Sequence, residues 1–295
     1  MRGRRYARRV PDPASLRRHY AKVCDVADFD DPAFRARGQE LRPEIDLGWQ
    51  FDRKNWESIM ATFLLEEAGV LDGARVLSVG AGREAVLFWI AERAARTVAV
   101  DVYGQGEFAG SDAPAGMLTD PDRYSPFGRP LPGLEVRSMD ARSMPELADG
   151  SFDAVYSLSS IEHFGSPADI RAAAAEIGRV LRPGGYAYLA TELILEPAPS
   201  WLRRARDAVN RASGGRWLRR ELFTEPELLS ELVEPSGLTL VQPVDTTISP
   251  RSFANKAVKR GRGLRYPTGC FHPHIVLEIG GDVFTSVGLP LRKDG

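Results

Sequence analysis

The sequence predicts an α/β fold with a doubly wound, Rossmann-like sheet of seven strands, of which the final strand is antiparallel. Two observations support this fold class. Between residues 75 and 195, short apolar runs bounded by turn residues alternate with segments of helical periodicity, as in βαβ units with a parallel sheet. Near the end of the chain, Gly280-Gly281 separates two apolar runs within residues 274–289, which favours a hairpin and an antiparallel finish.

Hydrophobic periodicity assigns the remaining elements in chain order. Buried strands are predicted at 75–80, 97–102, 134–141, 151–160 and 186–195, and a further strand at 238–244. Helices are predicted at 56–68, 84–95, 168–181 and 224–237. Residues 103–133 form a connection rich in Gly and Pro that is too long to be a plain linker in a compact domain.

We predict one main domain over residues 56–295, preceded by an N-terminal extension or lid over residues 1–55. The extension begins with polar, proline-broken sequence, and the aromatic residues Trp49, Phe51 and Trp56 cluster near its end, where they could form a lid or be buried in the core. A basic helical insert at about 197–223 carries apolar residues along one helical face, with arginines between them. The insert would cover the substrate, meet a phosphate-bearing or membrane-surface partner, or be a solvated helix with buried arginine stems.

Composition excludes several classes of protein. The chain has 295 residues, of which 43% are apolar and 27% charged, so a disordered chain is excluded. Its net charge of −1 gives no overall attraction to nucleic acid, and we expect no such partner. Cys24 and Cys270 are the only cysteines, which argues against a disulfide framework or a zinc site. No apolar run could cross a membrane and no apolar segment follows the arginine-rich start, so we expect a cytoplasmic protein without an integral membrane segment or a metal.

A glycine-containing turn joins the first predicted strand to the next helix. In VLSVGAGREA (76–85), Gly80, Ala81 and Gly82 lie where the backbone could approach a ligand and where helix N–H groups are free. With Ala85 the turn also fits the G-x-G-x-x-A pattern of dinucleotide-binding proteins. A tight turn that binds nothing is the alternative.

Asp101 ends the second predicted strand, 19 residues after Gly82. A carboxylate at this point can accept hydrogen bonds from both hydroxyls of an adenosine ribose, in NAD or in S-adenosylmethionine. The alternative is an acid that caps a surface loop.

Three later segments distinguish the two cofactors. Met139, Asp140 and Ala141 close the third strand, where Asp140 could accept from an adenine amino group and Met139 could pack on the ring. The segments DGSFDAVYSLSSIEHF (149–164) and RVLRPGGYAYLATE (179–192) follow in order. With these features the sequence resembles the class I S-adenosylmethionine-dependent methyltransferases, of the methyltransferase 11 type, over about residues 73–195.

The resemblance implies S-adenosylmethionine as the cofactor and a role for individual residues. The cofactor-binding residues would be Gly80, Ala81 and Gly82 along the methionine moiety, Asp101 at the ribose, Val102 and Tyr103 beside the adenine, Met139, Asp140 and Ala141 at the adenine, and Ser157 under the methionine part. The sequence departs from the family at Ser78, where an acid is usual, and at Glu84, where a third glycine is common.

Glu162 and His163 follow the fourth predicted strand on the side expected for the site. Histidine is the side chain best suited to take a proton near neutral pH, so His163, with Glu162, is the candidate base. The alternative is that both residues are positional and share no part in the chemistry.

We therefore predict an enzyme that transfers a methyl group from S-adenosylmethionine to a small molecule. The expected acceptor is a hydroxyl of a sugar or natural product, which could bear phosphate or belong to a glycan. One alternative is a non-catalytic S-adenosylmethionine-binding subunit that serves a partner, which Ser78 and the basic segments would permit. The other is an NAD(P)-linked oxidoreductase, favoured only by the G-x-G-x-x-A pattern.

Overall fold

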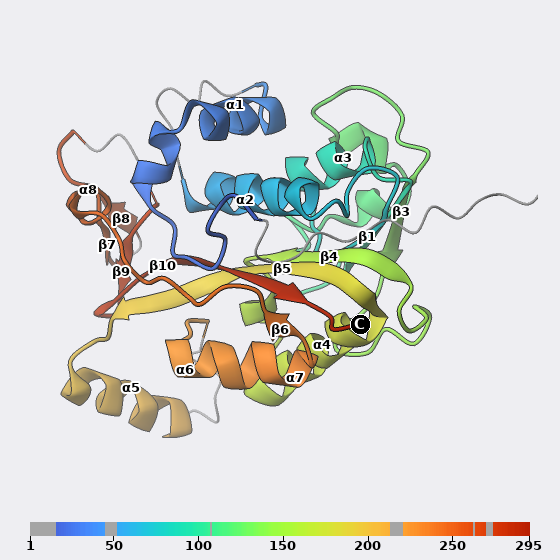
Figure 1. The fold of residues 1–295 in the computed structure, drawn as a ribbon. Coiled ribbons are helices and arrows are strands. Elements are labelled where there is room, and N and C mark those ends of the chain that lie inside the picture. The colour runs from blue at the N-terminus through green and yellow to red at the C-terminus, as the bar shows by residue number, and fades with distance from the viewer. Residues whose placement is uncertain (1–15, 45–51, 107, 213–220, 262, 270–273) are drawn as a thin grey trace, which may run out of the picture.

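One twisted, mixed sheet forms the centre of the protein in the computed structural model (Figure 1). The structure describes residues 16–44, 52–106, 108–212, 221–261, 263–269 and 274–295, without the side chains of residues 206, 207, 210 and 211. The sheet has ten strands in the order β3-β2-β1-β4-β5-β10-β9-β7-β8, and β6 pairs with β10 outside this path.

The first five strands are parallel to one another. Their bounds are β1 Arg75–Val79, β2 Arg96–Asp101, β3 Leu134–Ser138, β4 Phe152–Leu158 and β5 Leu181–Glu196. The long strand β10, Asp282–Arg292, runs antiparallel to β5. The predicted α/β class with a parallel sheet and an antiparallel final strand is therefore confirmed.

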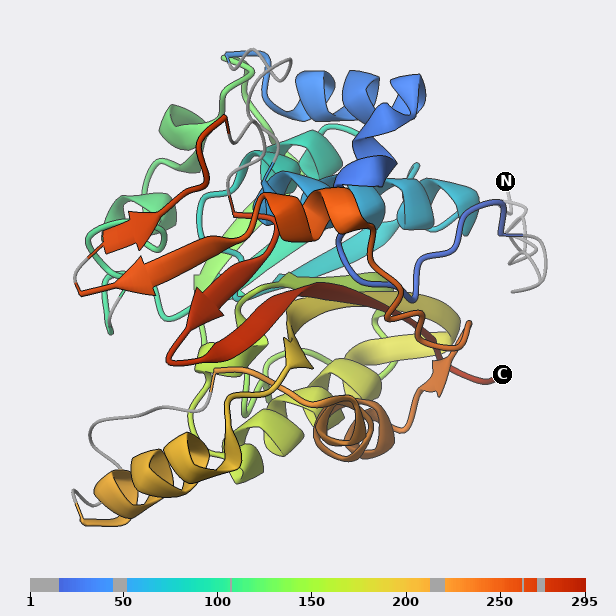
Figure 2. The same cartoon turned by 90° about the vertical axis from the view of Figure 1, so that its left-hand side faces the viewer.

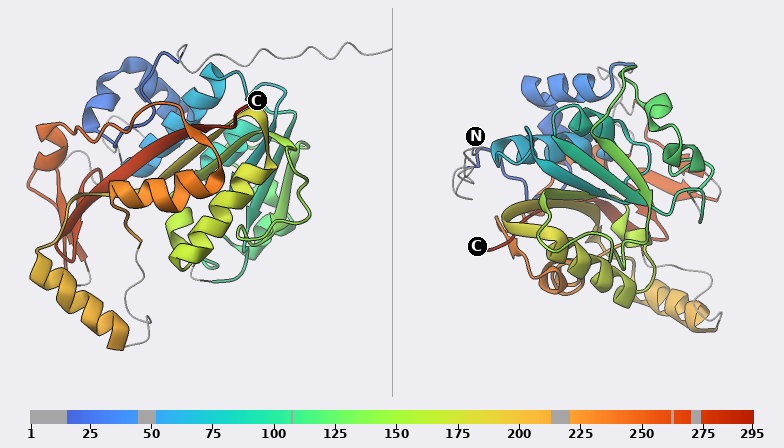
Figure 3. Two further views of the ribbon diagram at one scale, coloured as in Figure 1. Left: turned by 60° about the horizontal axis from the view of Figure 1, so that its bottom comes forward. Right: turned by 90° about the vertical axis from the view of Figure 1, so that its right-hand side faces the viewer.

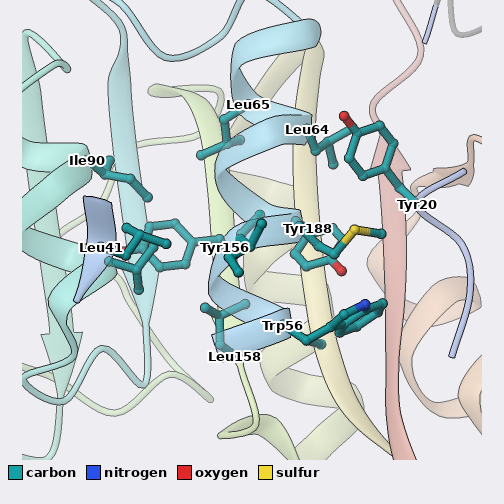
Figure 4. Packing of buried hydrophobic residues seen from close by; sticks show 14 of the residues in the cluster. Tyr20, Leu41, Trp56, Leu64, Leu65, Ile90, Tyr156, Leu158 and Tyr188 are labelled. Carbon is teal, nitrogen blue, oxygen red and sulfur yellow. The ribbon is translucent and has the colours of Figure 1, made fainter. Parts of the chain in front are cut away.

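The central strands are apolar on both sides because helices cover both faces of the sheet. On one face lie α1 Pro32–Leu41, α2 Arg53–Glu67 and α3 Ala85–Ala91; on the other lie α4 Pro167–Val180, α6 Glu225–Leu228 and α7 Glu234–Ser236 (Figures 1 and 3). The first face buries Trp56 of α2 close to Tyr188 of β5 (Figure 4). Because Trp56 lies fully inside this core, it is not available to a lid; Trp49 and Phe51 lie outside the described residues.

The helices begin where the sequence supplies caps. The Asp52 side chain accepts a hydrogen bond from the backbone N–H of Asn55 at the start of α2. Ser166 and Asp169 form a reciprocal capping box at the start of α4. Capping fixes where α2 begins, and this helix is the element that carries Arg53 and Lys54 to the site described below.

The sheet contains more strands than the seven predicted. Beyond β10, a small antiparallel and parallel extension consists of β9 Leu277–Ile279, β7 Ala257–Arg260 and β8 Gly263–Arg265, preceded by α8 Pro250–Ala254 (Figure 2). Strands β7 and β8 were not predicted, because residues 251–265 are basic. Both strands are largely exposed and lack the apolar run by which a buried strand is recognised. The hairpin at Gly280-Gly281 is confirmed, with β9 and β10 as its arms.

The strand predicted at 238–244 is reduced to β6, Thr239–Leu240. The reason is a competing partner: residues 20–24 of the N-terminal extension lie along the same edge of β10. There the Cys24 N–H donates to the Ser286 carbonyl at 2.8 Å, and the Val23 N–H donates to the Asp245 carbonyl at 3.0 Å. Tyr20 and Cys24 are fully buried, so this part of the extension belongs to the core.

Two predicted helices also differ in extent. The helix at 84–95 is confined to α3, and the one at 224–237 is interrupted by a π-helical turn, η6 Leu229–Val233, between α6 and α7. Short 3-10 helices occur at η2 Val26–Asp30, η3 Ala115–Leu118, η4 Pro121–Tyr124 and η5 Ile161–His163. Among the described residues, none of the helices combines the length and apolar character needed to cross a membrane.

Candidate active site

A cavity of about 1560 Å³ opens at the carboxyl ends of the parallel strands, the usual ligand position in such sheets. The turn after β1, the ends of β2, β3 and β4, and the first residues of α2 line one part of it. Residues from β5, β7, β9, β10 and α5 Ser200–Ala212 line the other part. The cavity therefore has a side formed by the nucleotide-type loops and a side formed by the later elements.

Two glycines in the turn after β1 cannot be replaced without displacing neighbours. Gly80 has a φ of 63°, and a Cβ there would lie 2.4 Å from the Cβ of Ser160. Gly82 has a φ of 51°, and its Cβ would lie 2.9 Å from the Asp112 carbonyl oxygen. Ser160 also donates from its hydroxyl to the Gly80 carbonyl at 2.8 Å, so the loop is held against the end of β4.

Asp101 combines two roles in the geometry. Its Oδ2 accepts from the Gly82 N–H at 2.9 Å and its Oδ1 accepts from the Val102 N–H at 2.7 Å. Each carboxylate oxygen can accept a second hydrogen bond, so both oxygens keep capacity for a ligand hydroxyl. Burial raises the pKa of Asp101, although the two N–H donors act in the opposite direction. The carboxylate thus fixes the glycine turn and still offers the paired acceptors that a ribose diol requires.

The structure brings most of the predicted site residues to this cavity. Those that line it are Gly80, Ala81, Gly82, Asp101, Val102, Met139, Asp140, Ala141 and His163.

Three predicted site residues do not line the cavity. Tyr103 lies beneath the glycine turn, where its hydroxyl donates to the Gly82 carbonyl at 2.9 Å, so it supports the turn from below. Ser157 is fully buried, because side chains alternate along β4 and its neighbour Leu158 takes the side toward the cavity. Glu162 is buried behind His163, and its Oε2 accepts from the Thr191 hydroxyl at 2.9 Å.

Asp140 lines the cavity but its carboxylate is already engaged. The backbone N–H and guanidinium of Arg142 donate to both of its oxygens, at 2.6 to 2.9 Å. This contact lowers the pKa of Asp140. The predicted hydrogen bond from an adenine amino group to Asp140 would therefore require Arg142 to shift.

Glu84 is the carboxylate of the glycine turn that reaches the cavity, whereas Ser78 is buried within β1. Burial raises the pKa of Glu84 to about 7, and the positive charge of Lys54 opposes this rise. A carboxylate in this environment is stabilised further by any cation that enters the cavity. Glu84 therefore places a carboxyl group at the cavity, whereas Ser78 stands at the position where the family usually has an acid.

His163 lies at the end of η5 and points its ring toward the later elements. Its Nδ1 is 3.5 Å from Oε1 of Glu221, and its ring packs edge-on against Phe108 with centroids 5.0 Å apart. Burial opposes protonation of the imidazole, but the carboxylates of Glu221, Glu162 and Glu192 outweigh it and raise the pKa of His163. The histidine is therefore made more basic by nearby carboxylates, and its contact with Glu221 is a long ion pair rather than a formed hydrogen bond.

A buried polar network lies next to His163. The Glu57 side chain is fully buried, and its Oε1 accepts from the Ser159 hydroxyl at 2.6 Å and from the Ser286 hydroxyl. Arg53 pairs with Glu57 at 3.5 Å and contacts Glu192. This network joins α2, β4, β5 and β10 beneath the cavity. Two of its members, Arg53 and Glu192, also line the cavity.

Sequence reasoning did not find Glu57, Glu192 or Glu221. Glu57 lies inside an otherwise regular amphipathic helix, which gives no signal of a buried charge. Glu192 is the last residue of the segment 179–192 and had no predicted role, and Glu221 lies near the end of the basic insert. Only the folded chain brings their carboxylates to one site.

Comparisons with known proteins show what the chain is similar to. Residues 77–189 match the family model of a methyltransferase domain, Methyltransf_11. An O-methyltransferase of Pyrenophora dematioidea is 30% identical over 155 residues, which cover 51% of this chain and 46% of the relative. A ubiquinone biosynthesis O-methyltransferase of Pseudomonas aeruginosa is 26% identical over 170 residues, covering 57% of this chain and 62% of the relative. The chain thus spans about half to three fifths of the length of these relatives.

The solved structure of a Methanosarcina mazei S-adenosylmethionine-dependent methyltransferase has a TM-score of 0.46 and 17% identity, covering 77% of this chain and 96% of that chain.

The fold, the glycine turn and the family-model match define one class of protein. Residues 77–189 match a methyltransferase domain, of the type that the resemblance predicted. S-adenosylmethionine is the cofactor expected of this domain, and the match disfavours the NAD(P)-linked alternative.

Proposed function

We propose that this chain is an S-adenosylmethionine-dependent O-methyltransferase that acts on a hydroxyl of a small molecule. The observation that carries the proposal is the pairing of His163 with Glu221 in the same cavity that Asp101 and the glycine turn enter. A histidine whose basicity is raised by a neighbouring carboxylate is suited to remove a proton from a hydroxyl. Two curated relatives are also named as O-methyltransferases, which supports oxygen as the acceptor atom.

The first part of the cavity fits the cofactor. Asp101 would accept from the ribose hydroxyls, and the Gly80 and Gly82 backbone would lie along the methionine part. Glu84 would face the ammonium group, whose charge would offset the burial that now raises the pKa of this carboxyl to about 7. When bound, S-adenosylmethionine supplies an electrophilic methyl group on a sulfonium that is already a good leaving group.

The second part of the cavity is suited to an acceptor with an apolar body. A volume of about 1560 Å³ exceeds the roughly 300–1,000 Å³ of a typical single-ligand pocket, so there is room for two ligands side by side. The apolar side chains on this side are Ile194, Leu222, Leu277, Ile279 and Phe284. These walls favour a ring-bearing natural product over a free, fully hydroxylated sugar.

His163 would take the proton as the acceptor oxygen gains the methyl group. With Nδ1 directed at Glu221, Nε2 is the ring nitrogen left for the acceptor hydroxyl. The proton moves from the hydroxyl to Nε2, and the Glu221 carboxylate stabilises the resulting imidazolium. Holding the two ligands in line and excluding water supplies the rest of the rate enhancement.

Methyl transfer by the purified chain tests this function. The chain is incubated with S-adenosylmethionine and a panel of catechols, phenols, glycosides and amines, and products are identified by mass spectrometry. We expect O-methylated products that diminish strongly in His163→Ala. Methylation of amines alone would contradict the choice of oxygen. Binding of S-adenosylhomocysteine without turnover of any acceptor would favour the non-catalytic subunit.

A further inference from the structure

Helix α5 presents an apolar face that no other described part of the chain covers. Trp201 is 66% exposed and Val209 is 56% exposed, which makes them the most exposed large apolar side chains among the described residues. With about 3.6 residues per turn, the exposed residues Ala205, Ala208 and Ala212 fall on the same face. Exposed apolar stripes of this length on a helix mark an interaction surface.

The helix also stands apart from the body of the protein (Figures 1, 2 and 3). Its contact with the body is made near its first turn, where Leu202 lies against Gly281 of the β9–β10 hairpin. The apolar face therefore contributes little to the core, and folding alone does not account for it.

The charge of this segment is strongly positive. Residues 203–220 contain seven arginines and one aspartate. Arg203 and Arg204 are exposed, and neither has an ion-pair partner within the described part of the chain. Together with Ser200, they belong to the lining of the cavity. The apolar face of α5 therefore adjoins unpaired cations that also line the cavity.

We propose that α5 docks this protein on an anionic lipid surface. A helix with one apolar face and a strongly basic remainder is suited to lie in a membrane interface, with its apolar side chains among the acyl chains. Each arginine near an anionic surface adds electrostatic attraction. A second copy of the chain is disfavoured as the occupant, because a symmetric contact through α5 would bring together two sets of the four arginines that this helix carries.

Docking through α5 brings the cavity close to the lipid surface, because Arg203 and Arg204 belong both to α5 and to the cavity lining. An acceptor with an apolar tail could then enter from the membrane. This last consequence rests on the proposed function, whereas the docking itself does not.

Vesicle flotation with the full chain tests the proposal, without cofactor or acceptor. We expect binding to vesicles of phosphatidylcholine with phosphatidylglycerol, little binding to phosphatidylcholine alone, and a decrease as salt is added. Trp201→Ala with Val209→Ala should lower the affinity at least about tenfold. The matched control is Leu118→Ala, an exposed apolar residue near β3, and it should have no effect.

A charge reversal supplies the second arm. Arg203→Glu with Arg204→Glu should weaken vesicle binding strongly, whereas Arg123→Glu on η4 should not. Circular dichroism spectra and melting temperatures equal to those of the parent would show that the α5 variants are folded. The proposal is overturned by absence of binding to the anionic vesicles, or by equal binding of the Trp201/Val209 variant. Light scattering that shows a dimer dependent on Trp201 would also overturn it, in favour of a second copy.

Discussion

Replacing Asp101 by asparagine should weaken binding of S-adenosylhomocysteine by about 10- to 150-fold while the protein remains folded. Each oxygen of Asp101 accepts one N–H of the glycine turn and keeps one position for a ribose hydroxyl. Asparagine converts one of these oxygens into a donor, so one charged hydrogen bond to the ligand is lost. Such a bond contributes roughly 1.5–3 kcal/mol, which gives the expected range.

The stability of the fold should respond much less than the affinity. Burial raises the pKa of Asp101 in the folded protein above its unfolded value. A carboxyl with a raised folded pKa reduces stability at pH values above its unfolded pKa, and this penalty disappears as the pH falls below that value. Asparagine removes this penalty. The stability gained partly offsets the stability lost because one N–H of the glycine turn is left without an acceptor. We therefore expect a melting temperature within a few degrees of the parent.

Calorimetric titration with S-adenosylhomocysteine measures the affinity, and scanning calorimetry measures the stability. Asp153→Asn is the matched control, since Asp153 also accepts a backbone N–H, from Arg75 at 2.8 Å, but lies outside the cavity. If the Asp101 variant binds S-adenosylhomocysteine as tightly as the Asp153 variant, the assignment of Asp101 to the ribose is refuted.

Three further predictions concern the base, the glycine turn and the N-terminal segment. His163→Ala should lower turnover by about 10²–10⁴ with unchanged S-adenosylhomocysteine affinity. Because Glu221 helps to raise the pKa of His163, the acid limb of the parent rate profile should move to lower pH in Glu221→Gln; an unmoved limb would contradict the pairing. Gly80→Ala should abolish cofactor binding, as measured by calorimetry, because its Cβ would overlap a neighbouring side chain at 2.4 Å; a variant that binds normally would show that the turn yields. Deleting residues 1–22 should lower the melting temperature, because the last residues of this segment pair with β10. Deleting residues 1–15 should lower the melting temperature less and should leave cofactor affinity within a few-fold. Equal stability of the two truncations would refute this reading.

Local sequence determined the parallel half of the sheet and the residues that line the cavity at its strand ends. Apolar runs that are buried on both faces can be recognised without knowledge of their partners, so β1 to β5 were predicted near their observed positions. Gly80, Gly82 and Asp101 were found for a similar reason. In a parallel sheet the residue that follows each strand necessarily lies at the ligand edge, so chain position alone places it there.

Tertiary structure decided the rest, because it depends on contacts between distant segments. The hydroxyls that meet Glu57 belong to Ser159 and Ser286, 102 and 229 residues away, and no local pattern encodes such meetings. Residues 20–24 pair with the edge of β10, so the strand predicted at 238–244 is shorter than expected. Amphipathic sequence identified α5 as a helix, but only the fold shows that its apolar face is turned to solvent. Periodicity reports which residues share a face, whereas the neighbours available to that face are set by the whole chain.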